Sequence, residues 1–277
     1  MRILVIARLT FREAIRRKIA LTALILGLLF LLLFNLGFFF IVRQVSAEPF
    51  MPVLAVRNLY SSFQLAGLYA ANFLSIAMAA LVSADTLAGE ISSGTIQSVA
   101  CKPLRRVEIV IGKWLGFAGL LSLYLGLLAG GLILSVWLQT GFLPPQPVVG
   151  LALMLFGCLI MMTVTLAFSS TLSTLATGGA VFGLYGVAFI GSWVEQIGSY
   201  INNSTAIQIG IVSSLIMPSE ALWRRAAHEM TTALVQMVAG GPFTSRSVPS
   251  DAMIIYAGLY LLIALGAAVY LFNHRDL

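Results

Sequence analysis

Residues 114–139 read WLGFAGLLSLYLGLLAGGLILSVWLQ and begin a stretch, from Trp114 to Val194, without any Asp, Glu, Lys or Arg. About 20 apolar helical residues cross the ~30 Å hydrocarbon layer of a bilayer, where a charged residue costs roughly 2.5–3.5 kcal/mol or more. Of all 277 residues, 60% are hydrophobic and 9% are charged, whereas soluble domains carry about 25% charged residues. The composition therefore predicts an integral membrane protein.

Six apolar runs are long enough to cross a membrane, and in lipid they must be helices because every backbone polar group needs an internal partner. Within the charge-free stretch, a Pro-rich break at 144–147 and a Ser/Thr-rich break at 169–177 separate the runs. We expect one all-α transmembrane domain over residues 1–277. Its six spans are expected at residues 19–42, 60–84, 114–139, 148–168, 178–194 and 252–272.

The basic residues lie mainly on one side of these spans. If the N-terminus is cytoplasmic, eleven of the 16 Lys and Arg residues lie on the cytoplasmic side and five lie outside. Cytoplasmic loops carry the excess of Lys and Arg in membrane proteins. The distribution predicts a multi-pass protein of the inner (cytoplasmic) membrane with both termini in the cytoplasm. The pI of 9.6 reflects these charges at span ends and does not indicate nucleic-acid binding.

Residues 1–18 have the pattern of an amphipathic helix ahead of the first span. Apolar residues recur at helical spacing from Leu4 to Ile15. Three arginines follow one another four residues apart on the other face: Arg8, Arg12 and Arg16. A basic face of this kind fits the anionic head groups of the inner leaflet, and contact with a cytoplasmic partner is the alternative.

Residues 199–251, between the fifth and sixth spans, are expected outside the cell. Residues 205–217 are apolar but too short to cross the bilayer, and Ser219 is placed to cap a second helix that runs to about residue 238. In that helix, Glu220 and Arg224 are four apart on the side that we expect to face water. The short helices predict a lid on the outer ends of the spans or, alternatively, an outer gate for the substrate.

The sequence lacks the motifs of several catalytic classes. It has no GxxxxGK[ST] loop for ATP, no HExxH and no GxSxG, and its two cysteines are expected at different depths. Asp85 and Glu195 lie at span ends, where a solvated charge costs little, and no span has an ionisable centre of the kind that relays protons or sodium. We therefore expect no enzyme, no metal site and an apolar or amphipathic cargo that is moved by energy from elsewhere.

Residues 85–113, DTLAGEISSGTIQSVACKPLRRVEIVIGK, form a charged segment between the second and third spans. Its charges need water or a partner. Gly94 lets the chain turn, and Pro103 disfavours helix at the residue before it. We expect this segment to form a cytoplasmic coupling helix, an elbow suited to transmit the motion of a docked protein to both spans. An ordinary polar loop is the alternative.

This segment resembles the ABC-2 type permease family, the membrane subunits of ATP-binding-cassette transporters. The resemblance rests on Glu90-x-x-x-Gly94-Thr95, on Lys102-Pro103-Leu104-Arg105-Arg106 and on the Gly112-Lys113 pair that opens the third span. The final residues 272–277, FNHRDL, are similar to the Phe-x-x-Arg-Asp-Leu ending of these permeases. Residues 217–224 are similar to an outer segment of the branch that contains the nitrous-oxide-reductase maturation permease.

The resemblance implies a permease that binds no cofactor itself, pairs with a second copy or a pseudo-symmetric partner, and docks two P-loop ATPase subunits that hold ATP and Mg. It implies ATPase-coupling roles for Glu90, Gly94, Thr95, Lys102, Pro103, Arg105, Arg106 and Lys113. It also places the second and fifth spans at the dimer interface, where Gly179, Gly183 and Gly186 would allow close helix approach.

An apolar slot for cargo is expected between these two spans, with ordinary helix packing as the alternative. Its expected lining is Phe63, Phe73, Met78, Phe182, Tyr185 and Phe189. The function that this pattern favours is export by an ABC transporter. The alternatives are an accessory permease for metalloenzyme maturation, a stand-alone channel or carrier, and a membrane enzyme that acts on lipid.

Overall fold

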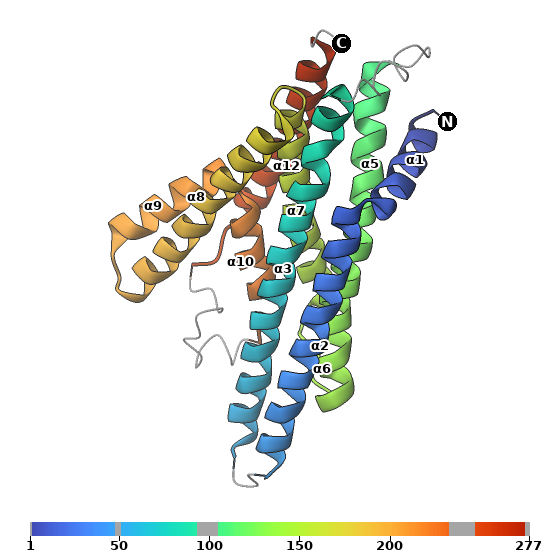
Figure 1. The fold of residues 1–277 in the computed structure, drawn as a ribbon. Helices are drawn as coiled ribbons and strands as arrows, with labels where there is room; N and C mark the ends of the chain where they lie inside the picture. Colours follow the sequence, from blue (N-terminus) through green and yellow to red (C-terminus); the bar gives the residue numbers. More distant parts are fainter. Residues whose placement is uncertain (1, 48–50, 93–104, 233–246, 275–277) are drawn as a thin grey trace.

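The computed structural model describes residues 2–47, 51–92, 105–232 and 247–274, and every regular element in these ranges is helical (Figure 1). Six helical spans in these ranges are long and apolar enough to cross a membrane. They are α2 (Lys18–Ala47), α3 (Val53–Ser92), α5 (Arg106–Leu125) continued through the π turn η1 (Gly126–Gly130) into α6 (Gly131–Thr140), α7 (Pro147–Ser169), α8 (Thr174–Tyr200) and α12 (Asp251–Asn273). Each contains one predicted span, and the all-α membrane fold is confirmed.

The breaks within the charge-free stretch occur where the sequence predicts them. The helix α6 ends at Gly141, whose φ of 69° is the left-handed conformation that glycine adopts at helix C-termini. Pro147 occupies the first turn of α7, where its missing N–H is harmless. Ser173 caps α8 by accepting a hydrogen bond from the N–H of Ala176. Local sequence thus sets the helix ends.

The start of α1 and the end of α12 lie at one end of the bundle, together with the end of α3 and the start of α5 (Figure 1). The Arg106 guanidinium donates to the carbonyl oxygens of Phe272 at 3.3 Å and Asn273 at 3.0 Å, so the start of α5 is held against the end of α12. A cation there also complements the negative end of the α12 dipole. Helix α3, with 40 residues, is about 60 Å long and extends beyond the hydrocarbon layer.

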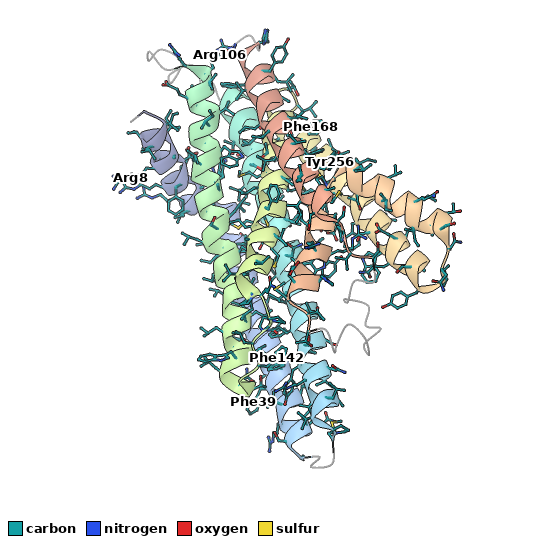
Figure 2. The ribbon with its side chains drawn as sticks, turned by 180° about the vertical axis from the view of Figure 1, so that it is seen from behind. Arg8, Phe39, Arg106, Phe142, Phe168 and Tyr256 are labelled. Carbon is teal, nitrogen blue, oxygen red and sulfur yellow. The ribbon has the colours of Figure 1, made fainter. Side chains whose placement is uncertain are left out.

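The amphipathic helix α1 (Arg2–Arg16) lies along α5, and its three arginines are exposed. Arg8 points away from the bundle (Figure 2). The face against α5 contains Thr10 and Ala14, whereas Leu4 is 70% exposed. The covered face is therefore rotated relative to the predicted apolar stripe, and it packs on protein.

The contact between α1 and α5 depends on a glycine. A Cβ at Gly116 would lie 2.7 Å from the Ala7 carbonyl oxygen, whereas a Cβ at Gly119 would meet Phe11 at an ordinary 3.6 Å. We expect Gly116→Ala to destabilise the protein by about 1–3 kcal/mol, because the backbone of α1 must shift. Gly119→Ala is the matched control, and denaturant unfolding in detergent would measure both. Equal stability of the two variants would contradict this packing.

Helices α8 and α9 (Ser204–Ile216) form a hairpin that projects from the bundle, and α10 (Ser219–Glu229) turns back into it (Figure 1). The bend between α9 and α10 is 111°. Two expectations for this segment are wrong. Ser219 is the first helical residue and Pro218 occupies the N-cap position, with no side-chain cap. The second helix ends at Glu229 and not near residue 238.

Helix α10 is buried on nearly every side, including the side that the sequence predicts to face water. Glu220 and Arg224 are 1% and 2% exposed. The pair of Arg225 with Glu229, at 2.9 Å, is partly exposed. Helix α10 is therefore a core element between α7, α8 and α3, and not a lid over the ends of the spans.

Candidate functional site

The structure describes only part of the charged segment, residues 85–92 and 105–113. Helix α3 continues past Asp85 to Ser92 and carries Glu90 on its last turns, with a side chain that lies outside the described part of the structure. Gly94, Thr95, Lys102, Pro103 and the predicted coupling helix also lie outside the described residues.

Arg105, Arg106 and Lys113 differ in their surroundings. Arg105 is exposed, and its backbone N–H donates to Glu108 Oε2 at 3.1 Å, so it starts α5 with its side chain at the surface. Arg106 is engaged by the carbonyls of α12. Lys113 is 6% exposed. Of the three, Arg105 is therefore the one placed for contact with another protein.

Asp85 joins three helices at this end of the bundle. It lies 3.3 Å from Arg17 Nη1, at the junction of α1 and α2, and accepts a hydrogen bond from Thr174 Oγ1 at 3.1 Å, at the start of α8. Arg17 also pairs with Glu13 at 2.7 Å. Asp85 remains partly solvated, as predicted, with 43% of its side chain exposed. Its contacts connect the charged end of α3 to α8 and to the amphipathic helix.

An apolar groove of about 510 Å³ lies between α2, α3 and α8. Phe73 and Phe189 of the predicted slot line it, together with Leu26, Leu29, Phe30, Leu33, Tyr69, Ala70 and Leu74. The ring centroids of Phe73 and Phe189 are 6.4 Å apart, and Tyr185 lies 6.2 Å from Phe73. These aromatic rings bring α3 and α8 together within a single chain. The contact between Phe73 and Phe189 therefore forms without a second protomer.

The other residues that the sequence predicts to line the slot lie apart from the groove. Met78 lines a smaller cavity of about 340 Å³, which shares Leu26 and Leu74 with the groove. Phe63 packs on Phe34 and Phe38 of α2, with centroids 5.4 and 6.0 Å apart, in the core of the bundle. Phe182 is partly buried against the core. Three of the six residues thus line apolar cavities, and the others pack within the protein.

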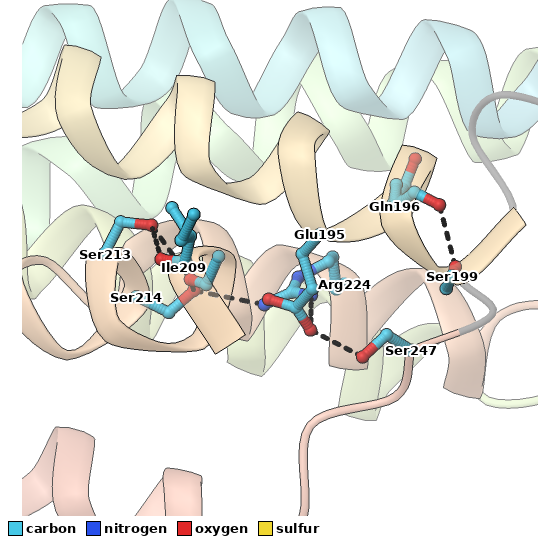
Figure 3. Close-up of polar contacts among 9 residues, drawn as sticks. Glu195, Gln196, Ser199, Ile209, Ser213, Ser214, Arg224 and Ser247 are labelled. Carbon is cyan, nitrogen blue, oxygen red and sulfur yellow. Dashed lines mark hydrogen bonds and ion pairs between the residues drawn. The ribbon is translucent and has the colours of Figure 1, made fainter. Parts of the chain in front are cut away.

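A buried polar cluster joins α8, α9 and α10, and the sequence reasoning missed it. Figure 3 shows Arg224 beside Ser214 and Glu195, with Ser247 on the same carboxylate. Arg224 pairs with Glu195, and both side chains are 3% exposed. Arg224 Nη2 donates to Ser214 Oγ at 3.1 Å, and the Ser247 hydroxyl donates to Glu195. The expectation that Glu195 is solvated is therefore wrong, because α10 supplies its counter-charge.

A second carboxylate is buried nearby. Glu220 accepts a hydrogen bond from the Tyr185 hydroxyl, which connects α10 to the aromatic rings beside the groove. The sequence gives no clear signal for the polar cluster. Arg224 is followed by Arg225 and lies four residues after Glu220, which is the pattern of a polar helix face.

Comparison with known proteins places the chain in a family. A search of curated proteins found no match. A family model described as "ABC-2 family transporter protein" matches residues 4–277, which is nearly the whole chain. The six apolar helical spans and the charged end shared by α3, α5 and α12 agree with the multi-pass membrane domain of such a transporter. The chain belongs to the ABC-2 family of transporter proteins.

Proposed function

We propose that this permease subunit of an ABC transporter exports an apolar or amphipathic molecule, driven by ATP hydrolysis on two separate P-loop ATPase subunits that dock on residues 85–113. The observation that carries the proposal is the match of residues 4–277 to a transporter family in which ATP-binding-cassette partners are general. ATP and Mg belong to the ATPase subunits in this proposal, because the chain has no phosphate-binding loop.

The described end of the bundle supports docking there. Glu90 extends beyond the membrane span on α3, and the exposed Arg105 opens α5. A protein bound across these helix ends would push on both spans together. Asp85 would carry that motion to α8 through Thr174, and to the amphipathic helix through Arg17.

The surface of α8 supports pairing with a second permease. Within the described chain, a Cβ at Gly179, Gly183 or Gly186 would meet nothing within 4 Å, so these glycines make no close approach inside the protomer. Small residues of this kind permit close packing of helices in lipid. A homodimer through α8 would cover them, whereas a pair with a different permease would need a complementary face on that protein.

The groove between α2, α3 and α8 supports an apolar or amphipathic cargo. Its lining is almost wholly apolar, and its 510 Å³ is enough to hold part of a lipid-sized molecule. The groove also agrees with transport that is powered by partner subunits, because its lining residues are uncharged. Membership of the nitrous-oxide-reductase maturation branch, and with it a role in metalloenzyme maturation, stays a prediction.

Co-purification with the ATPase tests the docking proposal. The complex in lipid should hydrolyse ATP, and Glu90→Ala or Arg105→Ala should weaken the complex at least about tenfold, because a hydrogen bond to a charged group contributes roughly 1.5–3 kcal/mol. Arg43→Ala, exposed near the end of α2 that lies away from the charged segment, is the control. Unchanged affinity and ATP hydrolysis in both docking variants would exclude this surface.

Thiol labelling tests the orientation. In a background without Cys101, a cysteine at Ser46, at the end of α2, should react with a membrane-impermeant reagent in intact cells. A cysteine at Arg12, which is exposed on α1, should react only after the cells are opened. Native Cys158 is buried and should stay silent in both. The reverse pattern would place the charged segment outside and remove the ATPase proposal.

A further inference from the structure

The apolar groove continues into the smaller cavity of about 340 Å³ that lies toward the charged end of the bundle. Helices α2 and α3 run side by side along both cavities (Figure 1). On α2 the lining residues recur at helical spacing, from Lys18 through Thr22 and Leu26 to Leu33. The two cavities meet at Leu26 and at Leu74 of α3. They therefore form one continuous trough, the α2–α3 trough.

The length of the α2–α3 trough matches a lipid chain. Lys18 and Leu33 are fifteen positions apart, which is about 22 Å along a helix. One leaflet of a bilayer contributes about half of the ~30 Å hydrocarbon layer. Leu26, Leu29 and Leu33 are half exposed or more, so the trough is open along its side. An extended acyl chain thus fits lengthwise and can enter from the surrounding bilayer.

Lys18 stands at the end of the trough that lies beside the charged segment. Among the described residues that line the trough, it is the only charged one, and its side chain is exposed. The neighbouring acids are engaged by Arg17, which lies 2.7 Å from Glu13 and 3.3 Å from Asp85. In the described part of the chain, no acid forms an ion pair with Lys18. The mouth of the trough therefore carries an ammonium without a counter-charge.

The other polar groups of this cavity already have partners. The Thr22 hydroxyl donates to the Lys18 carbonyl at 2.9 Å, and the Tyr124 hydroxyl donates to the Ala23 carbonyl at 3.0 Å. Polar recognition in the trough thus depends on the Lys18 ammonium. A zwitterionic head group would bring a second ammonium close to it, whereas an anionic phosphate pairs with it directly. The charge at the mouth therefore favours an anionic head group.

We propose that the α2–α3 trough binds an anionic phospholipid from the leaflet on the side of the charged segment. Its phosphate lies at Lys18, and one acyl chain runs past Leu26 and Leu74 into the groove. As an assignment of the cargo, this inference deepens the proposed export function and rests on it. Binding itself does not require the ATPase subunits.

Photochemical labelling by lipids tests the binding. The full-length permease is placed in phosphatidylcholine bilayer discs with a trace of phosphatidylglycerol, which is anionic, or phosphatidylethanolamine, which is zwitterionic. Each probe has a diazirine in its acyl chain, and mass spectrometry locates the labelled residues. The anionic probe should label Leu26 and Leu74 about fivefold more, as expected for one basic residue at an anionic surface. Leu262 and Ile263, exposed on α12, are the reference and should be labelled equally by both. Equal labelling of the trough would overturn the proposal.

A charge variant tests the role of Lys18. Lys18→Gln should reduce trough labelling by the anionic probe to the level of the zwitterionic probe. Arg12→Gln is the matched control, because it removes the same charge from the exposed face of α1, outside the trough, and it should keep the preference. An equal loss in both variants would assign the preference to the basic face of α1 and overturn the proposal.

A filling variant tests the place of the chain. Ala77 lines the lower cavity, so Ala77→Phe should reduce labelling of Leu26 and Leu74 by both probes. Ala252→Phe, at an exposed position of α12, is the control and should leave labelling unchanged. Unchanged labelling in Ala77→Phe would show that the chain does not lie in the trough.

ATP hydrolysis tests whether the bound lipid is the cargo. In the complex with its ATPase subunits, phosphatidylglycerol should raise the rate of wild type and not that of Lys18→Gln. An unresponsive wild-type complex whose trough is still labelled would overturn the cargo assignment. Failure of the complex to form would instead contradict the proposed docking, and the labelling result would stand without it.

Discussion

Replacing Arg224 with methionine should lower the free energy of unfolding by about 3–5 kcal/mol, because the buried Glu195 carboxylate would lose its counter-charge. Both side chains are 3% exposed, so water cannot take the place of the guanidinium. The pair also joins α8 to α10, and Arg224 adds a hydrogen bond to Ser214 of α9 at 3.1 Å. Loss of the arginine should therefore loosen the whole hairpin of α8 and α9.

Denaturant unfolding in detergent would measure this effect against two controls. Combining Arg224→Met with Glu195→Gln should restore most of the lost stability, since replacing a buried ion pair by neutral residues is often close to neutral. Arg225→Met removes partly exposed pairs with Glu229 and Asp251 and a hydrogen bond to the Pro249 carbonyl at 3.1 Å, and it should cost only about 1–2 kcal/mol. If Arg224→Met and Arg225→Met lowered the free energy of unfolding equally little, the pair of Glu195 with Arg224 would not be buried as described.

Replacing Gly210 with alanine should also destabilise the protein, by about 1–3 kcal/mol or more, because α8 and α9 are in backbone contact there. The added Cβ would lie 2.7 Å from the carbonyl oxygen of Gly191 and 2.2 Å from the Cβ of Glu195. Neither atom is the end of a flexible side chain, so the two helices would have to separate. That separation would also displace Glu195 from Arg224.

Gly266→Ala in α12 is the control for Gly210→Ala. A Cβ at Gly266 meets nothing within 4 Å in the described chain, and alanine favours helix over glycine by up to about 1 kcal/mol. Thermal unfolding should therefore show a lower midpoint for Gly210→Ala and an unchanged or higher midpoint for Gly266→Ala. A stable Gly210→Ala variant would mean that the hairpin of α8 and α9 is not packed at backbone distance.

Two kinds of sequence signal account for what could be predicted. The six spans follow from the length and apolarity of each run, which are local properties, and the helix ends follow from local chemistry such as Gly141 and Pro147. The charged segment was found for the same reason, because charges between two apolar runs must lie outside the hydrocarbon layer. The family resemblance was carried by that segment, and the match over residues 4–277 confirms it.

The packing between helices was less predictable, because lipid is as apolar as a protein core and an apolar face does not reveal which of the two it contacts. Phe63 and Phe73 lie on the same helix and are equally apolar, yet Phe63 packs on α2 and Phe73 lines the groove. Gly183 and Gly210 are likewise indistinguishable by residue type, yet only Gly210 lies at a close helix contact.

The sequence by itself determined six membrane helices, the breaks between them in the charge-free stretch, a charged segment between two of them and a transporter family. Only the tertiary structure decided that Glu195 and Arg224 are buried together. They are 29 positions apart, and each reads as a solvated residue at a helix end or on a polar helix face. Their burial depends on the bend of 111° after α9, which directs α10 into the bundle. A buried charge is tolerable only beside its partner, and that partner is supplied by the fold and not by neighbouring sequence.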